Sequence, residues 1–124
     1  MKIWFDGGCR PNPGRIETAV VAAGKVYFRD DQGIGDSNDA EWLALLEALK
    51  IGGDLGVSEV TLLGDSATVV DHARGASRRA AARFGPYLAS FNELAAGFES
   101  VRIRRVPRAQ NLAGIALARM HARI

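Results

Sequence analysis

The sequence of 124 residues has one cysteine, two histidines and no long apolar stretch. With Cys9 alone, an intrachain disulfide is excluded, which favours a reducing compartment. No apolar run approaches the ~20 residues that a membrane span needs, and Asp6 comes too early in the chain for a secretory signal peptide. The length fits one domain over residues 1–124. We therefore expect a single-domain cytoplasmic protein that has no membrane partner.

Acidic residues are scarce in the second part of the chain. Residues 1–71 carry 12 acidic and 6 basic side chains, whereas residues 72–124 carry 2 acidic and 10 basic ones, all arginine. No acidic residue occurs from Ser100 to the C-terminus. This asymmetry indicates a polyanionic partner. The alternative is that folding interleaves the two parts, so that their charges balance.

The apolar pattern predicts an α/β protein. We expect strands over 3–5, 17–23, 26–28, 59–63 and 101–106. Helices are predicted over 39–51, 67–73, about 86–98 and 110–123, and the first of these has an apolar stripe of Trp42, Leu45, Leu46 and Leu49. Three antiparallel strands followed by βαβ units predict a five-stranded mixed sheet, flanked by helices.

Three carboxylates stand at the ends of predicted elements. Asp6 ends the first strand, Glu41 lies in the first turn of the long helix, and Asp65 follows the fourth strand. Active sites of open α/β sheets form outside the carboxyl ends of strands. Carboxylate oxygens are the ligands that Mg²⁺ or Mn²⁺ prefers, and two such ions ~3.5–4 Å apart suit phosphodiester cleavage. The three residues are therefore candidate metal ligands and catalytic residues.

Each carboxylate also has a structural interpretation. Asp6 and Gly7 form a common turn pair. Asn38 and Glu41 resemble a capping box, and Asp65 before Ser66 could cap the following helix. These interpretations involve no metal, so they compete with the active-site hypothesis.

Four segments together resemble the motifs of type 1 ribonuclease H, and they occur in that family's order over essentially the whole chain. They are Asp6-Gly7-Gly8-Cys9-Arg10-Pro11-Asn12-Pro13-Gly14, Asn38-Asp39-Ala40-Glu41, Leu62-Leu63-Gly64-Asp65-Ser66 and Val106-Pro107-Arg108-Ala109-Gln110-Asn111. The last is typical of compact bacterial and archaeal members. The resemblance implies a ribonuclease-H-like fold and the metal-dependent cleavage of the RNA strand of RNA–DNA hybrids, which leaves a 5′-phosphate and a 3′-hydroxyl.

The resemblance also assigns substrate contacts. Backbone groups of Gly7 and Gly8 would contact the ribose 2′-hydroxyl, which distinguishes RNA from DNA. Asn12 and Asn38 would contact the nucleic-acid backbone or base edges, although turn and cap chemistry explains both equally well. The hybrid would be the partner of a monomer.

This sequence departs from the family pattern in three places. Gly114 stands where the family has its fourth carboxylate, and Ala67 replaces a glutamine. The loop before the last helix has no histidine, and there Arg108 could hold phosphate as a fixed cation. His121 is interpreted as a cation at the C-terminal end of a helix. Because of Gly114, the alternatives to an active ribonuclease H are a binding module without turnover and a related nuclease that acts on DNA.

Four further arginines occupy the place where some family members carry a basic extension that grips substrate. They are Arg74, Arg78, Arg79 and Arg83. These side chains could contact DNA phosphates. The alternative is a solvated surface without a partner.

Overall fold

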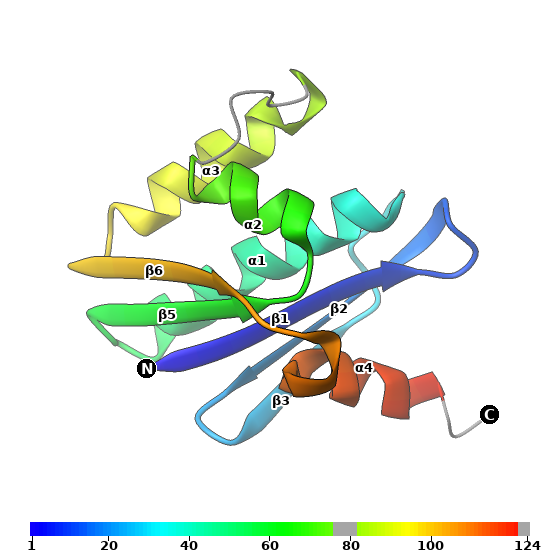
Figure 1. Ribbon diagram of the computed structural model, residues 1–124, viewed down its shortest axis with the longest axis horizontal. Helices are drawn as coiled ribbons and strands as arrows, with labels where there is room; N and C mark the ends of the chain where they lie inside the picture. The colour runs from blue at the N-terminus through cyan, green and yellow to red at the C-terminus, as the bar shows by residue number, and fades with distance from the viewer. Residues whose placement is uncertain (76–81, 122–124) are drawn as a thin grey trace.

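The computed structural model describes residues 1–75 and 82–121. Its strands are β1 (Lys2–Cys9), β2 (Gly14–Ala22), β3 (Lys25–Arg29), β4 (Ile34–Gly35), β5 (Glu59–Gly64) and β6 (Ser100–Arg105). Its helices are α1 (Ser37–Asp54), α2 (Ala67–Ala73), α3 (Gly85–Ala95) and α4 (Leu112–His121), with short 3₁₀ turns η1 (Ala82–Phe84) and η2 (Arg108–Gln110). Helices α1, α2 and α3 lie on one side of the sheet and α4 lies on the other (Figure 1).

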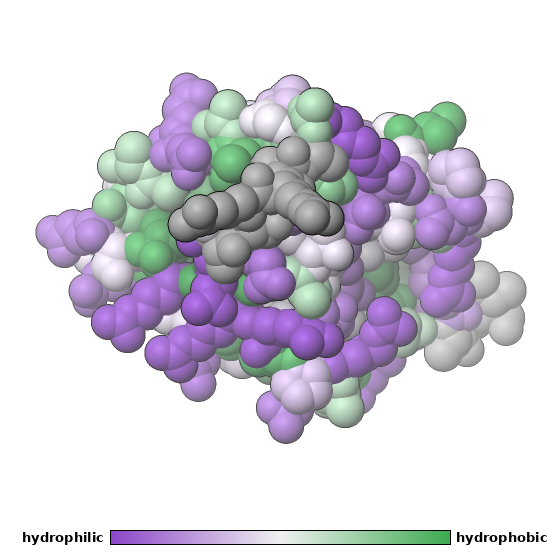
Figure 2. Space-filling view, turned by 45° about the horizontal axis from the view of Figure 1, so that its top comes forward, coloured by the Kyte–Doolittle hydropathy of each residue, from purple (hydrophilic) through white to green (hydrophobic). Residues whose placement is uncertain are grey.

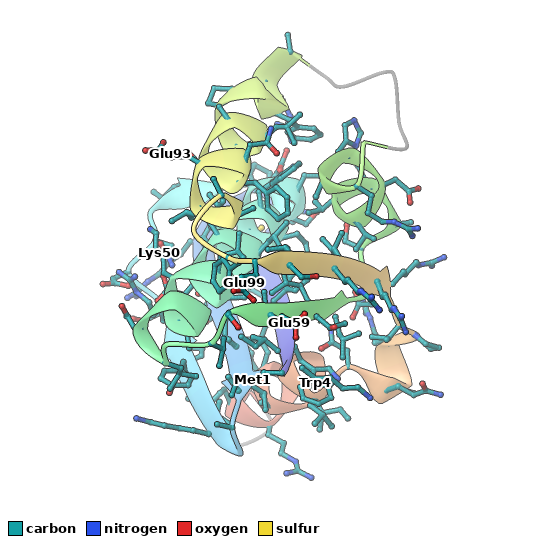
Figure 3. All side chains as sticks on the ribbon, turned by 90° about the vertical axis from the view of Figure 1, so that its left-hand side faces the viewer. Met1, Trp4, Lys50, Glu59, Glu93 and Glu99 are labelled. Carbon is teal, nitrogen blue, oxygen red and sulfur yellow. The ribbon has the colours of Figure 1, made fainter. Side chains whose placement is uncertain are left out.

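The sheet is mixed, as the sequence predicts. Its strand order is β3-β2-β1-β5-β6, and β4 pairs with β2 beside this path. The first three strands are antiparallel, whereas β1, β5 and β6 run parallel. At one end of these parallel strands, the Met1 amino group donates to the Glu59 carbonyl at 3.1 Å, and Figure 3 labels Met1, Glu59 and Glu99 at this end. Their carboxyl ends therefore meet at the opposite end of the sheet.

Two apolar cores cover the two faces of the sheet. The larger core lies between the sheet and α1–α3 and includes Trp42, Leu45 and Leu49, all at most 1% exposed. The smaller core joins Ala19 and Val21 to α4. The predicted stripe of α1 is therefore buried in the larger core, where Trp42 stacks on Tyr87 of α3, because its period matches one side of a helix. Within the described ranges, no helix is both long and apolar enough to cross a membrane.

Several element boundaries differ from the predicted ones. Helix α1 begins at Ser37 because Asp36 caps it, and α3 ends at Ala95. The predicted last helix is divided into η2 and α4, because Asn111 has an extended backbone between them. The short strand β4 was not expected, since two residues are too few to show a strand pattern. The final positions of the predicted helix, 122 and 123, lie outside the described residues.

Candidate functional site

The three predicted carboxylates meet just beyond the last parallel pair of β1 and β5, although β1 does not end at Asp6 as expected but continues to Cys9. Asp6, Glu41 and Asp65 each offer an oxygen, and these oxygens all lie within 4.8 Å of one another. Asp6 comes from β1, Asp65 directly follows β5, and Glu41 comes from the first turns of α1. Parallel pairing of β1 with β5 places the two aspartates side by side. The fold thus assembles one carboxylate cluster from three separate parts of the chain.

None of the competing structural interpretations describes these carboxylates. Asp6 lies within β1 and forms no turn. The capping box of α1 consists of Asp36 and Asp39 rather than Asn38 and Glu41. The cap of α2 is Ser66, whose hydroxyl accepts a hydrogen bond from Val69 N at 3.3 Å. All three carboxylates are therefore free of the local roles that the sequence allowed.

Gly7 brings α1 close enough to β1 to place Glu41 beside Asp6. A Cβ atom on Gly7 would lie 2.1 Å from the Ala40 carbonyl oxygen, which is a severe clash. The Gly7 backbone also opposes the rise in the pKa of both the Asp6 and the Glu41 carboxylates. A glycine at this position therefore permits the close packing that the cluster requires.

Burial and mutual repulsion make the cluster reluctant to ionise without a counterion. Burial is the main cause that raises the pKa of Asp6 to about 6, and the charge of Asp65 contributes in the same direction. Arg108 opposes this shift. The pKa of Glu41 is raised well above its ordinary value, first by burial and then by the charge of Asp6. Carboxylates in close contact cannot all ionise readily unless a cation joins them.

The cluster fits a divalent cation. Glu41 is 8% exposed, and its Oε2 atom has no hydrogen-bond partner among the described residues. A buried carboxylate oxygen without a partner is unfavourable. Three convergent carboxylates form the hard oxygen donor set that Mg²⁺ and Mn²⁺ require. The residues that would hold such an ion are Asp6, Glu41 and Asp65.

Asn111 is a site residue to which the sequence analysis assigned no role. Its side chain is 0% exposed and its Nδ2 donates both to Phe5 O at 3.0 Å and to Asp65 Oδ2 at 3.1 Å. Its Oδ1 accepts from Ala113 N at 3.1 Å, at the start of α4. Asn111 therefore links β1, α4 and the Asp65 carboxylate. Its place in the Val106–Asn111 motif was the one available signal.

Replacing Asn111 by alanine should destabilise the fold markedly. The change removes three hydrogen bonds and leaves the Phe5 carbonyl and the Ala113 amide buried without this partner. We expect the free energy of unfolding, measured by urea denaturation, to fall by about 2 to 4 kcal/mol. Asn92→Ala, at an exposed position of α3, is the control and should change little. A loss for Asn111→Ala no larger than the control would contradict the linking role.

Gly114 lies beside the cluster, at the wall of an open pocket. A Cβ atom at this position would lie 3.4 Å from Asp6 Oδ2, which is an ordinary contact. The pocket has a volume of about 380 Å³ and is lined in part by Asp6, Gly7, Gly8 and Arg108. Helix α4 thus directs position 114 at the carboxylates, but the position carries no side chain.

His121 also lines this pocket, and its interpretation as a helix-end cation was incomplete. Its Nε2 atom contacts the Glu17 carboxylate of β2. Glu17 is paired with Gly8 across the β1–β2 ladder. The contact therefore joins the end of α4 to the strand next to the cluster, which the local sequence around His121 does not reveal.

The two predicted asparagines lie near the start of α1. Asn12 accepts a hydrogen bond from Ser37 N at 3.2 Å, and its Nδ2 donates to Ser37 Oγ at 3.3 Å. Asn38 is half-buried in the first turn, and its backbone helps to lower the pKa of the Asp36 carboxylate. Asn12 thus contributes to anchoring the helix that carries Glu41, while remaining exposed.

The arginines near α3 differ in their surroundings. Arg83 forms an ion pair with Asp36 at 2.8 Å, and Tyr87 donates a hydrogen bond to Asp39 at 3.0 Å. These contacts connect η1 and α3 to the start of α1. Arg74 is exposed, whereas Arg78 and Arg79 lie outside the described residues. The ion pair means that Arg83 is not a free cation for phosphate in this structure.

Comparisons with known proteins agree with this architecture. A family model described as reverse transcriptase-like matches residues 5–121. The ribonuclease HI of Halobacterium salinarum is 35% identical to this chain, and the match covers 93% of the chain. The chain spans only 60% of the length of that relative. The chain belongs to the type 1 ribonuclease H family.

Solved structures show the same relationship. The crystal structure of the Halobacterium salinarum RNase H1 superposes with a TM-score of 0.82 and 30% identity, covering 94% of this chain and 92% of the other. LC11-RNase H1, isolated from compost, has a TM-score of 0.78 and 25% identity over 94% of this chain and 90% of its own. The mixed sheet with helices on both faces is therefore a ribonuclease H fold.

Proposed function

We propose that this protein is a metal-dependent endonuclease that hydrolyses the RNA strand of RNA–DNA hybrids. The convergence of three carboxylates at the carboxyl ends of parallel strands carries the proposal. Family membership and the ribonuclease names of the relatives support it. All three candidate ligands come from one chain, so the proposed site would be complete in a monomer.

The chemistry follows from the donor set. Asp6, Glu41 and Asp65 would hold Mg²⁺ or Mn²⁺ for a two-metal mechanism, in which one ion would activate the attacking water and the other would stabilise the leaving oxygen. The water oxygen bonds to phosphorus, and the bond from phosphorus to the 3′-oxygen breaks. One product therefore carries a 5′-phosphate and the other a 3′-hydroxyl.

Surrounding residues would position the substrate. Asn111 holds the Asp65 carboxylate in place through its Nδ2 atom. Arg108, which is exposed at the pocket, would hold a phosphate. Backbone groups of Gly7 and Gly8 line the same pocket and would contact the ribose 2′-hydroxyl. Asn12 and Asn38 would contact the backbone or base edges of the hybrid.

The choice of an RNA–DNA hybrid as substrate rests on the relatives. LC11-RNase H1, which is 25% identical to this chain, has also been solved in complex with an RNA/DNA hybrid. This observation favours the hybrid over a small-molecule substrate.

A cleavage assay tests the proposal directly. Purified protein is incubated with a labelled RNA–DNA hybrid and Mg²⁺ or Mn²⁺, in parallel with RNA–RNA and DNA–DNA duplexes. We expect cleavage of the RNA strand of the hybrid alone, and a loss of about 10³-fold or more in Asp65→Asn. Asp71→Asn, at an exposed position of α2, should retain activity. Cleavage no greater than that of Asp65→Asn would contradict the proposal, and cleavage of DNA would favour the related nuclease.

The second candidate is a hybrid-binding module without turnover. Gly114 favours it, because the position directed at Asp6 provides no fourth ligand. Hybrid binding without cleavage in the same assay would support this alternative.

A further inference from the structure

Strand β6 presents arginines on the side that faces away from the main core. Ile103 is buried against α1–α3, so its neighbours Arg102 and Arg104 project to the opposite face by strand alternation. Both are exposed. Helix α4 packs on β1, β2 and β3, whereas β6 is the edge strand at the opposite end of the strand order. The arginines therefore stand on an uncovered surface.

These arginines differ from three others in the molecule. Arg15, Arg29 and Arg83 each pair with an aspartate. In contrast, no ion pair joins Arg102, Arg104 or Arg105 to a carboxylate of the residues in 1–75 and 82–121. Folding thus balances part of the charge asymmetry of the sequence but leaves β6 with unpaired positive charge.

The unpaired charges lead directly to the carboxylate cluster. Arg105 Nε donates to the Asp65 carbonyl at 3.4 Å, and Arg108 lies at the pocket of Asp6. We call Arg102, Arg104, Arg105 and Arg108 the arginine track, in which Arg102 and Arg104 lie on the uncovered face and Arg105, by the same alternation, starts from the other face at the end of β6. At ~3.3 Å per residue, Arg102 lies about 10 Å along the strand from Arg105. Along the axis of a duplex, each strand carries one phosphate per about 3.4 Å, so a track of this length parallel to the axis spans about three phosphates.

The track has a defined end. Figure 2 shows hydrophilic side chains gathered in a band across the front of the molecule, on the side where β6 lies in Figure 1. Figure 3 places Glu59 and Glu99 at the other end of β5 and β6, away from the cluster. Positive charge therefore extends from the site along β6 and stops at these glutamates.

We propose that the arginine track binds the phosphate backbone of the hybrid beyond the cleavage position, extending the nucleic-acid interface along β6. The inference rests on the proposed function only in taking the hybrid as the ligand. Guanidinium groups suit phosphate oxygens because they donate in pairs. Contacts of this kind release counterions and make affinity depend on salt.

Binding measured without cleavage tests the track. The affinity of the intact protein for a labelled 18-base-pair hybrid is followed by fluorescence anisotropy in EDTA at several salt concentrations. We expect Arg102→Gln/Arg104→Gln to weaken binding about 5- to 20-fold and to reduce the slope of log K against log salt by about 2. Arg102→Lys/Arg104→Lys should retain most of the affinity. Lys25→Gln/Lys50→Gln removes the same charge at exposed positions away from β6 (Lys50 in Figure 3) and is the control.

Each outcome decides for or against the track. The track is overturned if Arg102→Gln/Arg104→Gln binds the hybrid as tightly as Lys25→Gln/Lys50→Gln does. It is also overturned if the loss of affinity is confined to single-stranded RNA or DNA. Charged residues also protect edge strands from pairing with other chains. A glutamine variant that self-associates in size-exclusion chromatography and binds the hybrid normally would therefore overturn the proposal too. Because this test needs no cleavage, failure of the nuclease proposal would appear separately, in the cleavage assay.

Discussion

Replacing Glu41 by glutamine is expected to abolish cleavage and to make the metal-free protein more stable at neutral pH. Glu41 is buried, has one oxygen without a partner, and is repelled by Asp6. Glutamine has nearly the same shape but no charge to repel Asp6. We expect cleavage to fall by about 10³-fold or more, while the free energy of unfolding in EDTA at pH 8 rises by about 1 to 3 kcal/mol.

The direction of the pH dependence follows from the raised pKa values. Asp6 has a pKa of about 6 in the folded protein against 3.8 ordinarily. Between these values the folded state binds more protons than the unfolded state, so stability falls as pH rises through this window. Asp6 alone contributes a loss of about 3 kcal/mol once the pH exceeds its folded pKa. The raised pKa of Glu41 acts in the same direction.

Denaturation in EDTA across pH 4 to 8 measures this effect. The wild type should lose stability with rising pH, and Glu41→Gln should lose less. Addition of Mg²⁺ or Mn²⁺ at 100 times its dissociation constant should restore about 2.7 kcal/mol to the wild type and much less to the variant. Glu93→Gln, at an exposed position of α3 (Figure 3), is the matched control. If Glu41→Gln is less stable than this control in EDTA, repulsion between the carboxylates does not destabilise the metal-free protein.

Replacing Gly114 by aspartate is expected to tighten metal binding and raise cleavage by at least about tenfold when the metal is limiting. A side chain at this position would start 3.4 Å from Asp6 Oδ2, close enough for a carboxylate to join the cluster. In EDTA the Gly114→Asp protein should have a lower free energy of unfolding than a Gly114→Asn protein. The reason is that aspartate adds a fourth negative charge to groups that already repel one another.

Gly114→Asn is the control that isolates the charge. Either residue removes only part of the cost of about 1 kcal/mol that glycine has within a helix, because Asn and Asp are also poor helix formers, and the two side chains have nearly equal size. Titration of Mn²⁺ by calorimetry and cleavage rates at low metal concentration should therefore separate Asp from Asn. Equal metal affinities for the two variants would show that position 114 does not reach the metal, and that three carboxylates form the whole donor set.

Much of the fold could be predicted from local patterns. The apolar stripe of Trp42, Leu45 and Leu49 specified α1 and its buried face, because the helical period is visible in consecutive residues. The strands and their mixed arrangement followed in the same way. Boundaries were less accurate, since caps depend on single polar contacts: Asp36 and Asp39, not Asn38 and Glu41, close the start of α1.

The site could be predicted only in part. The order of the motifs predicted Asp6, Glu41 and Asp65 as candidate metal ligands. It also showed that position 114 has no acidic side chain. The sequence did not assign a role to Asn111, because a polar residue before a helix has the same appearance whether it caps the helix or holds a distant carboxylate. It also could not separate Arg83, which is paired with Asp36, from the unpaired arginines of β6.

The sequence by itself determined the residue types, their order and the local elements, and hence the family and the three candidate ligands. These features depend on short-range periodicity and on spacing along the chain. Only the tertiary structure decided that the carboxylates lie within 4.8 Å of one another, that burial raises their pKa values, and that positive charge remains unpaired along β6. Each of these depends on distances and solvent exclusion between residues far apart in the chain, which strand pairing and helix packing create.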